Sequence, residues 1–338
     1  MAGEETNVTY EQLADIEREF EDVELEITRQ QAVMTKALYE KRQKTVAEIP
    51  NFWPLVFEQA PQEVDAYIQP SDSAVLSSSL KSISVSRFEV EDGSKGDPRS
   101  IAIKFEFNEN EYFEDKVLEK KFWHRQSKDG DFAGLVGEPV PIKWKPKKDL
   151  TDGLLDMAIS VHEQEKKRGQ TGIPKIKDFT PEQKALQAKI QGTGMGGISF
   201  FALFGYRGYP VSAEENKEAL AKEQEKRRLR AEGKSTDDDE DEAPELVEAD
   251  EEDEEEILEI FADGEELAIA IAEDLWPSAI KYFSEFAPAP AQNRCTNYLE
   301  ANAQEQDGLS EMDFEELDGE IEDEEDDADE PPAKKRKA

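Results

Sequence analysis

A repeating row of apolar residues near the N-terminus constrains this chain more than any other feature. Between residues 10 and 48, apolar side chains recur at alternating spacings of three and four. One seven-residue step interrupts the row, and Gln30 fills the skipped position. This period places the row on one face of a single helix, flanked by charged and polar residues. The row, which we call the seam, consists of Leu13, Ile16, Phe20, Val23, Ile27 and Met34, and Ala37 extends it.

The two ends of this helix are marked in the sequence as well. Thr9 and Gln12 fit a capping box, and Pro50 stops the helix because the residue before a proline avoids the helical region. A helix of about 39 residues would be roughly 58 Å long, which exceeds the diameter of a small domain. Since one domain of this size cannot cover so long a row, we expect a partner helix and predict a homodimer. The alternative, an amphipathic helix packed on its own domain, stays open.

The charge of the chain is large and unevenly distributed. The 338 residues carry a net charge of −40, and 39 of the acidic residues but only 6 of the basic ones lie from Asp237 onwards. The net charge is therefore −33 in that last third and −7 before it. A polyanion repels nucleic acid and attracts basic partners within a Debye length of about 8 Å. We expect nucleic acid to be at most a weak ligand, even though Lys143–Lys148 and Lys166–Arg168 form small basic patches.

The middle of the chain has the pattern of a sheet. Residues 80–90, 101–107, 112–123 and 142–144 are predicted to form four strands, with residues 130–141 as a loop. The second of these alternates apolar and polar residues strictly, as a half-buried strand does. Short turns between successive strands predict an antiparallel meander, and helices before and after it give an α+β fold.

Composition divides the chain into three parts. Residues 1–50 hold the long helix, 51–286 an α+β domain with packing helices, and 287–338 an acidic tail predicted to be disordered. Inside the domain, residues 151–197 have no clear pattern. Residues 212–256 form a charged insert, with a solvated helix over 212–230 and a disordered acidic run over 237–256. A further amphipathic helix is expected from residue 267 to about Pro277.

The sequence offers no constellation for catalysis or metal binding. Cys295 is the only cysteine, and His124 and His162 are the only histidines, so an internal disulfide is excluded and a Cys/His zinc site nearly so. The glycine run at 192–197 lacks the Lys-Ser or Lys-Thr ending of a phosphate loop. The acidic runs lack the spaced ligands of a calcium loop. We therefore expect no catalytic residues, no metal and no cofactor, and a protein that is not an enzyme.

The C-terminus carries a candidate targeting signal. Lys334, Lys335, Arg336 and Lys337 follow a Pro-Pro pair in the predicted tail, which is the pattern that a nuclear import receptor recognises. A solvated basic tail is the alternative. No apolar run approaches the ~20 residues needed to span a bilayer, and the N-terminus lacks a signal-peptide pattern. We expect a nuclear protein with no membrane partner, and shuttling to the cytoplasm stays open.

Five sequence blocks resemble one known family when taken in order. Together they span residues 10–286 and are similar to the histone chaperones of the nucleosome assembly protein family, in particular its SET-type branch. The chain departs from that family pattern in residues 151–197 and 212–256. The blocks are Ile49-Pro50-Asn51-Phe52-Trp53 after the long helix, Phe105 to Phe113 (FEFNENEYF), Ile142-Lys143-Trp144-Lys145, Ser199-Phe200-Phe201 and Glu273-Asp274-Leu275-Trp276-Pro277.

The resemblance implies a headphone-shaped homodimer in which the long helices pair antiparallel and each carries an α+β "earmuff" domain. The underside of these domains and the acidic tail would hold core histones, shield them from DNA and assist nucleosome assembly and disassembly. Alternatively, the dimer would be a regulatory cofactor or inhibitor of a chromatin or signalling enzyme, a histone acetyltransferase or a protein phosphatase. The residues that the resemblance implies for histone binding are Glu265, Glu266, Glu273, Asp274, Glu109 and Glu111, and each is as compatible with an ordinary surface carboxylate.

Overall fold

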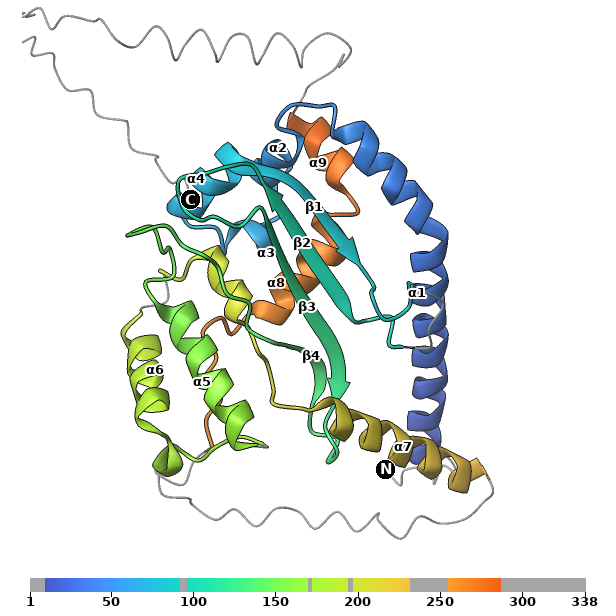
Figure 1. Ribbon diagram of the computed structural model, residues 1–338. Helices are drawn as coiled ribbons and strands as arrows, with labels where there is room; N and C mark the ends of the chain where they lie inside the picture. The colour runs from blue at the N-terminus through green and yellow to red at the C-terminus, as the bar shows by residue number, and fades with distance from the viewer. Residues whose placement is uncertain (1–9, 92–95, 170–171, 194–196, 232–254, 287–338) are drawn as a thin grey trace, which may run out of the picture. The chain divides into compact units, whose positions relative to one another are not determined.

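A long helix opens the structure, which is a computed structural model that describes residues 10–91, 96–169, 172–193, 197–231 and 255–286. This helix, α1 (Tyr10–Val46), has 37 residues and is roughly 56 Å long, and it runs along one side of the domain (Figure 1). The predicted long helix is confirmed and ends four residues before Pro50. Thr9 of the predicted capping box lies outside the described residues.

A four-stranded antiparallel sheet with strand order β1-β2-β3-β4 lies at the centre of the domain. Ile83 pairs with Phe105, Phe105 with Leu118, and Phe122 with Gly137. A meander in this order leaves β1 and β4 as the two edges of the sheet. The predicted α+β class is therefore confirmed. The strands are β1 (Leu80–Ser86), β2 (Ile101–Phe107), β3 (Val117–Gln126) and β4 (Ala133–Gly137).

The fourth strand prediction was wrong, and the bounds of two others were shifted. The fourth strand is β4, which lies inside the segment expected to be a loop, and residues 142–144 form only an isolated bridge between Trp144 and Phe113. The aromatic side chain at residue 144 serves packing and not a strand. The ring of Trp144 lies 5.7 Å from that of Phe113 and 5.8 Å from that of Phe201. The third strand begins at Val117 instead of residue 112, and the first ends at Ser86.

The core lies on the face of the sheet that is covered by helices. Phe105 is fully buried there, with its ring edge-on to Phe200 at 5.8 Å and to Phe204 at 6.0 Å. Both belong to the short helix η2 (Phe200–Gly205), whose residues are all buried. The helices that complete this layer are α2 (Phe52–Glu58), α3 (Gln62–Asp65), α4 (Pro70–Ser79), α8 (Gly264–Ala270) and α9 (Ala279–Phe286).

The segments without a clear sequence pattern are helical. α5 (Leu154–Arg168) and α6 (Pro181–Gly192) pack against each other. α7 (Ala213–Ala231) is the predicted solvated helix, and it packs on β3. The amphipathic helix expected up to Pro277 consists of α8 and a π-helical turn (Ile271–Leu275), and α9 follows. Disorder was predicted for residues 237–256 and 287–338, and all of these except Glu255 and Glu256 lie outside the described residues. For those two residues the prediction was wrong, because Glu255 forms a β-bridge with Lys175.

Candidate functional site

The seam on α1 is a continuous row of exposed apolar side chains. Its six members are all at least half exposed, from 51% for Ile16 to 75% for Met34. Two residues outside the predicted seam, Val33 and Leu38, are 59% and 65% exposed and widen the row towards the C-terminal end of the helix. A contiguous apolar patch of this extent on a folded chain marks an interaction surface.

The C-terminal turns of α1 attach the helix to the domain. Arg42 donates from Nη1 to the carbonyl oxygens of Trp276 at 2.6 Å and Pro277 at 3.1 Å. Its guanidinium also lies 4.7 Å from the ring centre of Trp276 and 4.8 Å from that of Tyr39. The next residue, Gln43, donates from its side-chain amide to the Ser82 hydroxyl at 2.6 Å, which joins α1 to the edge strand β1. These contacts fix the direction in which the helix leaves the domain.

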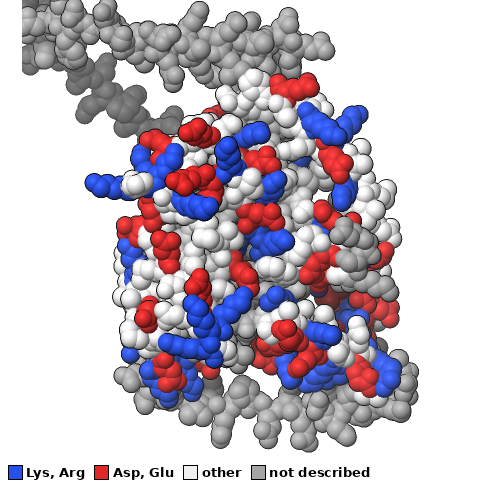
Figure 2. Space-filling view, in the orientation of Figure 1, with Lys and Arg blue, Asp and Glu red and all other residues white. Residues whose placement is uncertain are grey.

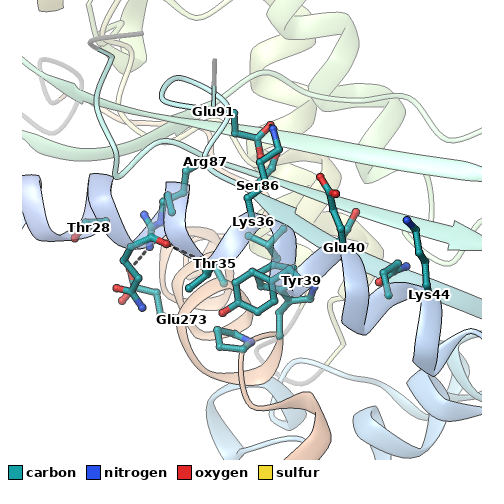
Figure 3. Close-up of a pocket in the computed structure, with 18 residues that line it drawn as sticks. Thr28, Thr35, Lys36, Tyr39, Glu40, Lys44, Ser86, Arg87, Glu91 and Glu273 are labelled. Carbon is teal, nitrogen blue, oxygen red and sulfur yellow. Dashed lines mark hydrogen bonds and ion pairs between the residues drawn. The ribbon is translucent and has the colours of Figure 1, made fainter. Parts of the chain in front are cut away.

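A groove of about 710 Å³ separates α1 from β1 and from residues 272–277 (Figure 3). Two ion pairs cross it, Lys36 to Glu91 at 3.9 Å and Arg87 to Glu273 at 3.2 Å. The side chains that line the groove include three carboxylates and three basic groups, so its charges balance. The groove is therefore not an acidic cradle, although one of the predicted histone-binding residues lies in it.

The first pair of predicted acids, Glu265 and Glu266, lies in the first turn of α8. Glu265 is half-buried, and its carboxylate accepts a hydrogen bond of 2.9 Å from the backbone N–H of Leu135 in β4. Glu266 is exposed and forms no ion pair or side-chain hydrogen bond with another described residue. The two neighbours therefore differ: Glu265 connects α8 to the sheet, while Glu266 is free to meet a ligand.

The second pair of acids is exposed but already bonded. Glu273 pairs with Arg87 across the groove, and the Asp274 carboxylate accepts a hydrogen bond of 2.9 Å from the Tyr282 hydroxyl. Burial and this hydrogen bond raise the pKa of Tyr282 to about 12.

The third pair of acids lies in the connection between β2 and β3. Glu109 and Glu111 are both exposed, and Glu111 forms an ion pair of 2.6 Å with Lys148. Like Glu266, Glu109 has no ion pair or side-chain hydrogen bond within the described part of the chain. The structure thus distributes the six acids over three places, and on the face drawn in Figure 2 acidic and basic side chains are interspersed.

The sequence interpretation missed a buried charged group in β3, on the face of the sheet that the helices cover. Lys120 is fully buried, and its Nζ donates to the carbonyl oxygens of Glu138, Phe204 and Tyr206 at 2.6, 3.2 and 2.5 Å. Burial lowers the pKa of Lys120 to about 7. The strand alternation could have found it, because Lys120 falls on the same face as Leu118 and Phe122.

Two other kinds of site are absent from the residues that the structure describes. No group of three or more histidine, cysteine or acidic side chains is arranged to hold a metal ion there. Nor does any helix in the described ranges combine the length and apolarity needed to cross a bilayer.

Comparison with known proteins identifies the family. The model of the nucleosome assembly protein (NAP) family matches residues 4–285. The chain belongs to the NAP family. The match includes residues 151–197 and 212–256, where the sequence departs from the resemblance noted above.

Individual NAP-family relatives match shorter stretches. A Schizosaccharomyces pombe protein named as a nucleosome assembly protein is 36% identical over 150 residues, covering 42% of this chain and 59% of the relative. Protein SET of Drosophila melanogaster is 35% identical over 135 residues, covering 39% and 46%. The chain thus spans about half the length of these two relatives. Among solved structures, Ccp1 has a TM-score of 0.47 at 27% identity, covering 84% of this chain and 98% of Ccp1.

Proposed function

We propose that this protein is a histone chaperone that binds basic core histones, shields them from DNA and assists nucleosome assembly and disassembly. Membership of the NAP family is the observation that carries this proposal. The net charge of −40 supports it, since a polyanion and DNA compete for the same basic surface of a histone. The mechanism is equilibrium competition and transfer of the histone, without a catalysed reaction.

We further propose that the working form is a homodimer in which two copies of α1 pair antiparallel through the seam. The exposure of Leu13, Phe20 and Ile27, each above half, supports this pairing. A second copy is the occupant with the matching shape and polarity, because a heptad row is covered best by another heptad row.

Among the six acids predicted to bind histones, we propose Glu266 and Glu109 as the primary contacts, because both are exposed and without an internal partner in the described chain. Glu273, Asp274 and Glu111 would have to share or exchange their present partners. Glu265 would contribute by holding α8 in place. Exposed ion pairs contribute only about 0–1 kcal/mol each, so affinity must come from many of them and should fall with salt.

We assign the protein to the nucleus, with the basic cluster Lys334–Lys337 as the segment that an import receptor binds. A nuclear site of action is also what a nucleosome assembly role requires.

The test is a titration of fluorescent core histones with the full-length protein and with a version that ends at Phe286, each at two salt concentrations. We expect both to bind, the shorter one more weakly, and both to weaken as salt rises. If binding disappears with residues 287–338, the charge of that segment alone is responsible and the folded domain is not a histone receptor.

A further inference from the structure

Helix α7 connects the sheet to the N-terminal half of α1. At its start, the Asn216 side chain accepts a hydrogen bond of 2.8 Å from the backbone N–H of Gln126, at the end of β3. Two residues later Glu218 pairs with Lys128 at 2.9 Å. These contacts anchor the first half of α7 on the sheet, and the helix continues from there towards the N-terminal end of α1 (Figure 1).

The second half of α7 meets α1 through a network of charges. Arg227 donates from Nη1 to the Asp22 carboxylate at 2.8 Å and from Nη2 to the Glu223 carboxylate at 2.9 Å. Glu223 in turn lies 4.0 Å from the guanidinium of Arg18, one turn before Asp22 on α1. Arg227 is therefore the residue through which α7 holds two carboxylates, one on each helix.

The network contacts the face of α1 that is turned away from the seam. A helix rotates by about 100° per residue, so Phe20 of the seam points roughly 160° away from Asp22. A helix held at Asp22 and Arg18 consequently presents Phe20, and the seam around it, on its free side. Nearer its C-terminus the same helix is held by Arg42 and Gln43.

We propose that Arg227 is a positioning residue for self-association, which holds the N-terminal half of α1 against α7 so that the seam faces outward before a second copy arrives. This inference rests on the proposed homodimer. Ordering a long helix during association costs affinity, and a helix that is already held avoids part of that cost. Because the network is partly exposed, its contribution should decrease as salt screens it.

The test compares two single substitutions that change charge equally on the same helix. In Arg227→Asp, the new carboxylate faces Asp22 and Glu223 and repels both. In the control Arg228→Asp, the lost cation has Glu225 of its own helix as its one ion-pair partner among the described residues. We expect Arg227→Asp to raise the dimer dissociation constant about three- to tenfold at low salt, measured by analytical ultracentrifugation. Arg228→Asp should leave it within twofold, and the difference should shrink in 0.5 M salt.

A charge exchange provides the rescue. Adding Asp22→Arg to Arg227→Asp restores an attractive pair in the reverse sense and should return the dissociation constant most of the way to that of the wild type. Equal dissociation constants for Arg227→Asp and Arg228→Asp would overturn the proposal, and so would an absence of rescue.

A second readout separates this proposal from the dimer itself. In a chain made monomeric by Leu13→Glu, Phe20→Glu and Ile27→Glu, the substitution Arg227→Asp should speed backbone hydrogen exchange over residues 14–26 relative to Arg228→Asp. If the wild type proves monomeric, the dimer proposal fails while this exchange experiment still decides whether α7 holds α1. Unchanged exchange would refute the positioning role in either case.

Discussion

Arg42 makes two kinds of contact with the same residue, since it donates to the carbonyl oxygen of Trp276 and stacks on its ring. Hydrogen bonds from a charged donor are worth about 1.5–3 kcal/mol, so Arg42→Ala should lower the free energy of unfolding by about 2 kcal/mol. Arg42→Lys should recover only part of this, because an ammonium lacks the planar fork that donates and stacks at once. Urea denaturation measures both variants, and full stability in Arg42→Lys would contradict the stacking role.

Lys120 makes stability depend on pH in a direction that can be stated in advance. Its folded pKa of about 7 lies below the ordinary lysine value of 10.5. Between these two values the unfolded chain binds more protons than the folded one, so the Lys120 contribution to the free energy of unfolding rises with pH. In Lys120→Met this contribution is lost.

The unfolding free energy of the wild type minus that of Lys120→Met should therefore increase from pH 7 to pH 9, by up to about 1.4 kcal/mol per pH unit. Denaturation of both proteins at three pH values in that range measures the difference, and subtraction removes the titration of all other groups. A difference that stays flat or declines would contradict a depressed lysine pKa.

Glu266 and Glu109 can be tested together as histone contacts. Replacing both with Lys should weaken histone binding about tenfold, because two attractive contacts become repulsive, while thermal stability stays unchanged. Glu58→Lys with Glu182→Lys is the matched control, since these acids are also exposed but were not predicted as contacts. Equal affinities of the two double variants would remove Glu266 and Glu109 from the site.

Glu265 shows why single residues of the candidate site could not be ranked from the sequence. Its role depends on the N–H of Leu135, which belongs to a strand that the sequence interpretation treated as loop. The neighbouring Gly134 leaves room for the carboxylate, because a Cβ at that position would lie 2.9 Å from a Glu265 oxygen. A charge reversal at Glu265 would thus disturb the domain as well as any ligand contact.

At the scale of elements, α1 carries the strongest prediction. Replacing Leu13, Phe20 and Ile27 with Glu should convert the protein to monomers, since six charges would enter one apolar interface. Sedimentation velocity measures the mass, and circular dichroism checks that the helix content remains. A dimer that persists in this variant would show that the seam is not the pairing surface.

The elements that could be predicted are those with a long, regular period. α1 shows several turns of a heptad row, and β2 shows four apolar residues in strict alternation, so both were placed closely. β4 has only five residues, two of them glycines, and no local pattern separates it from a loop. Its pairing with β3 is a tertiary contact, and α5 and α6 likewise depend on packing against each other.

At the scale of the whole molecule, the C-terminal basic cluster predicts where the protein resides. Deleting residues 334–337 should move a fluorescently tagged protein from the nucleus to the cytoplasm, because the import receptor loses its four cations. Replacing the three lysines of the cluster with Arg is the control and should preserve import. An unchanged nuclear signal after deletion would place the import determinant elsewhere.

The position of α1 beside the sheet has a consequence for solubility. β1 is an edge strand, and such edges invite pairing with the strands of other molecules. Gln43 of α1 donates a hydrogen bond to Ser82 near the start of β1. From there α1 runs alongside this edge, on the other side of the groove. A second sheet therefore cannot approach β1 edge-on. The long helix therefore covers this edge and protects it from edge-to-edge aggregation.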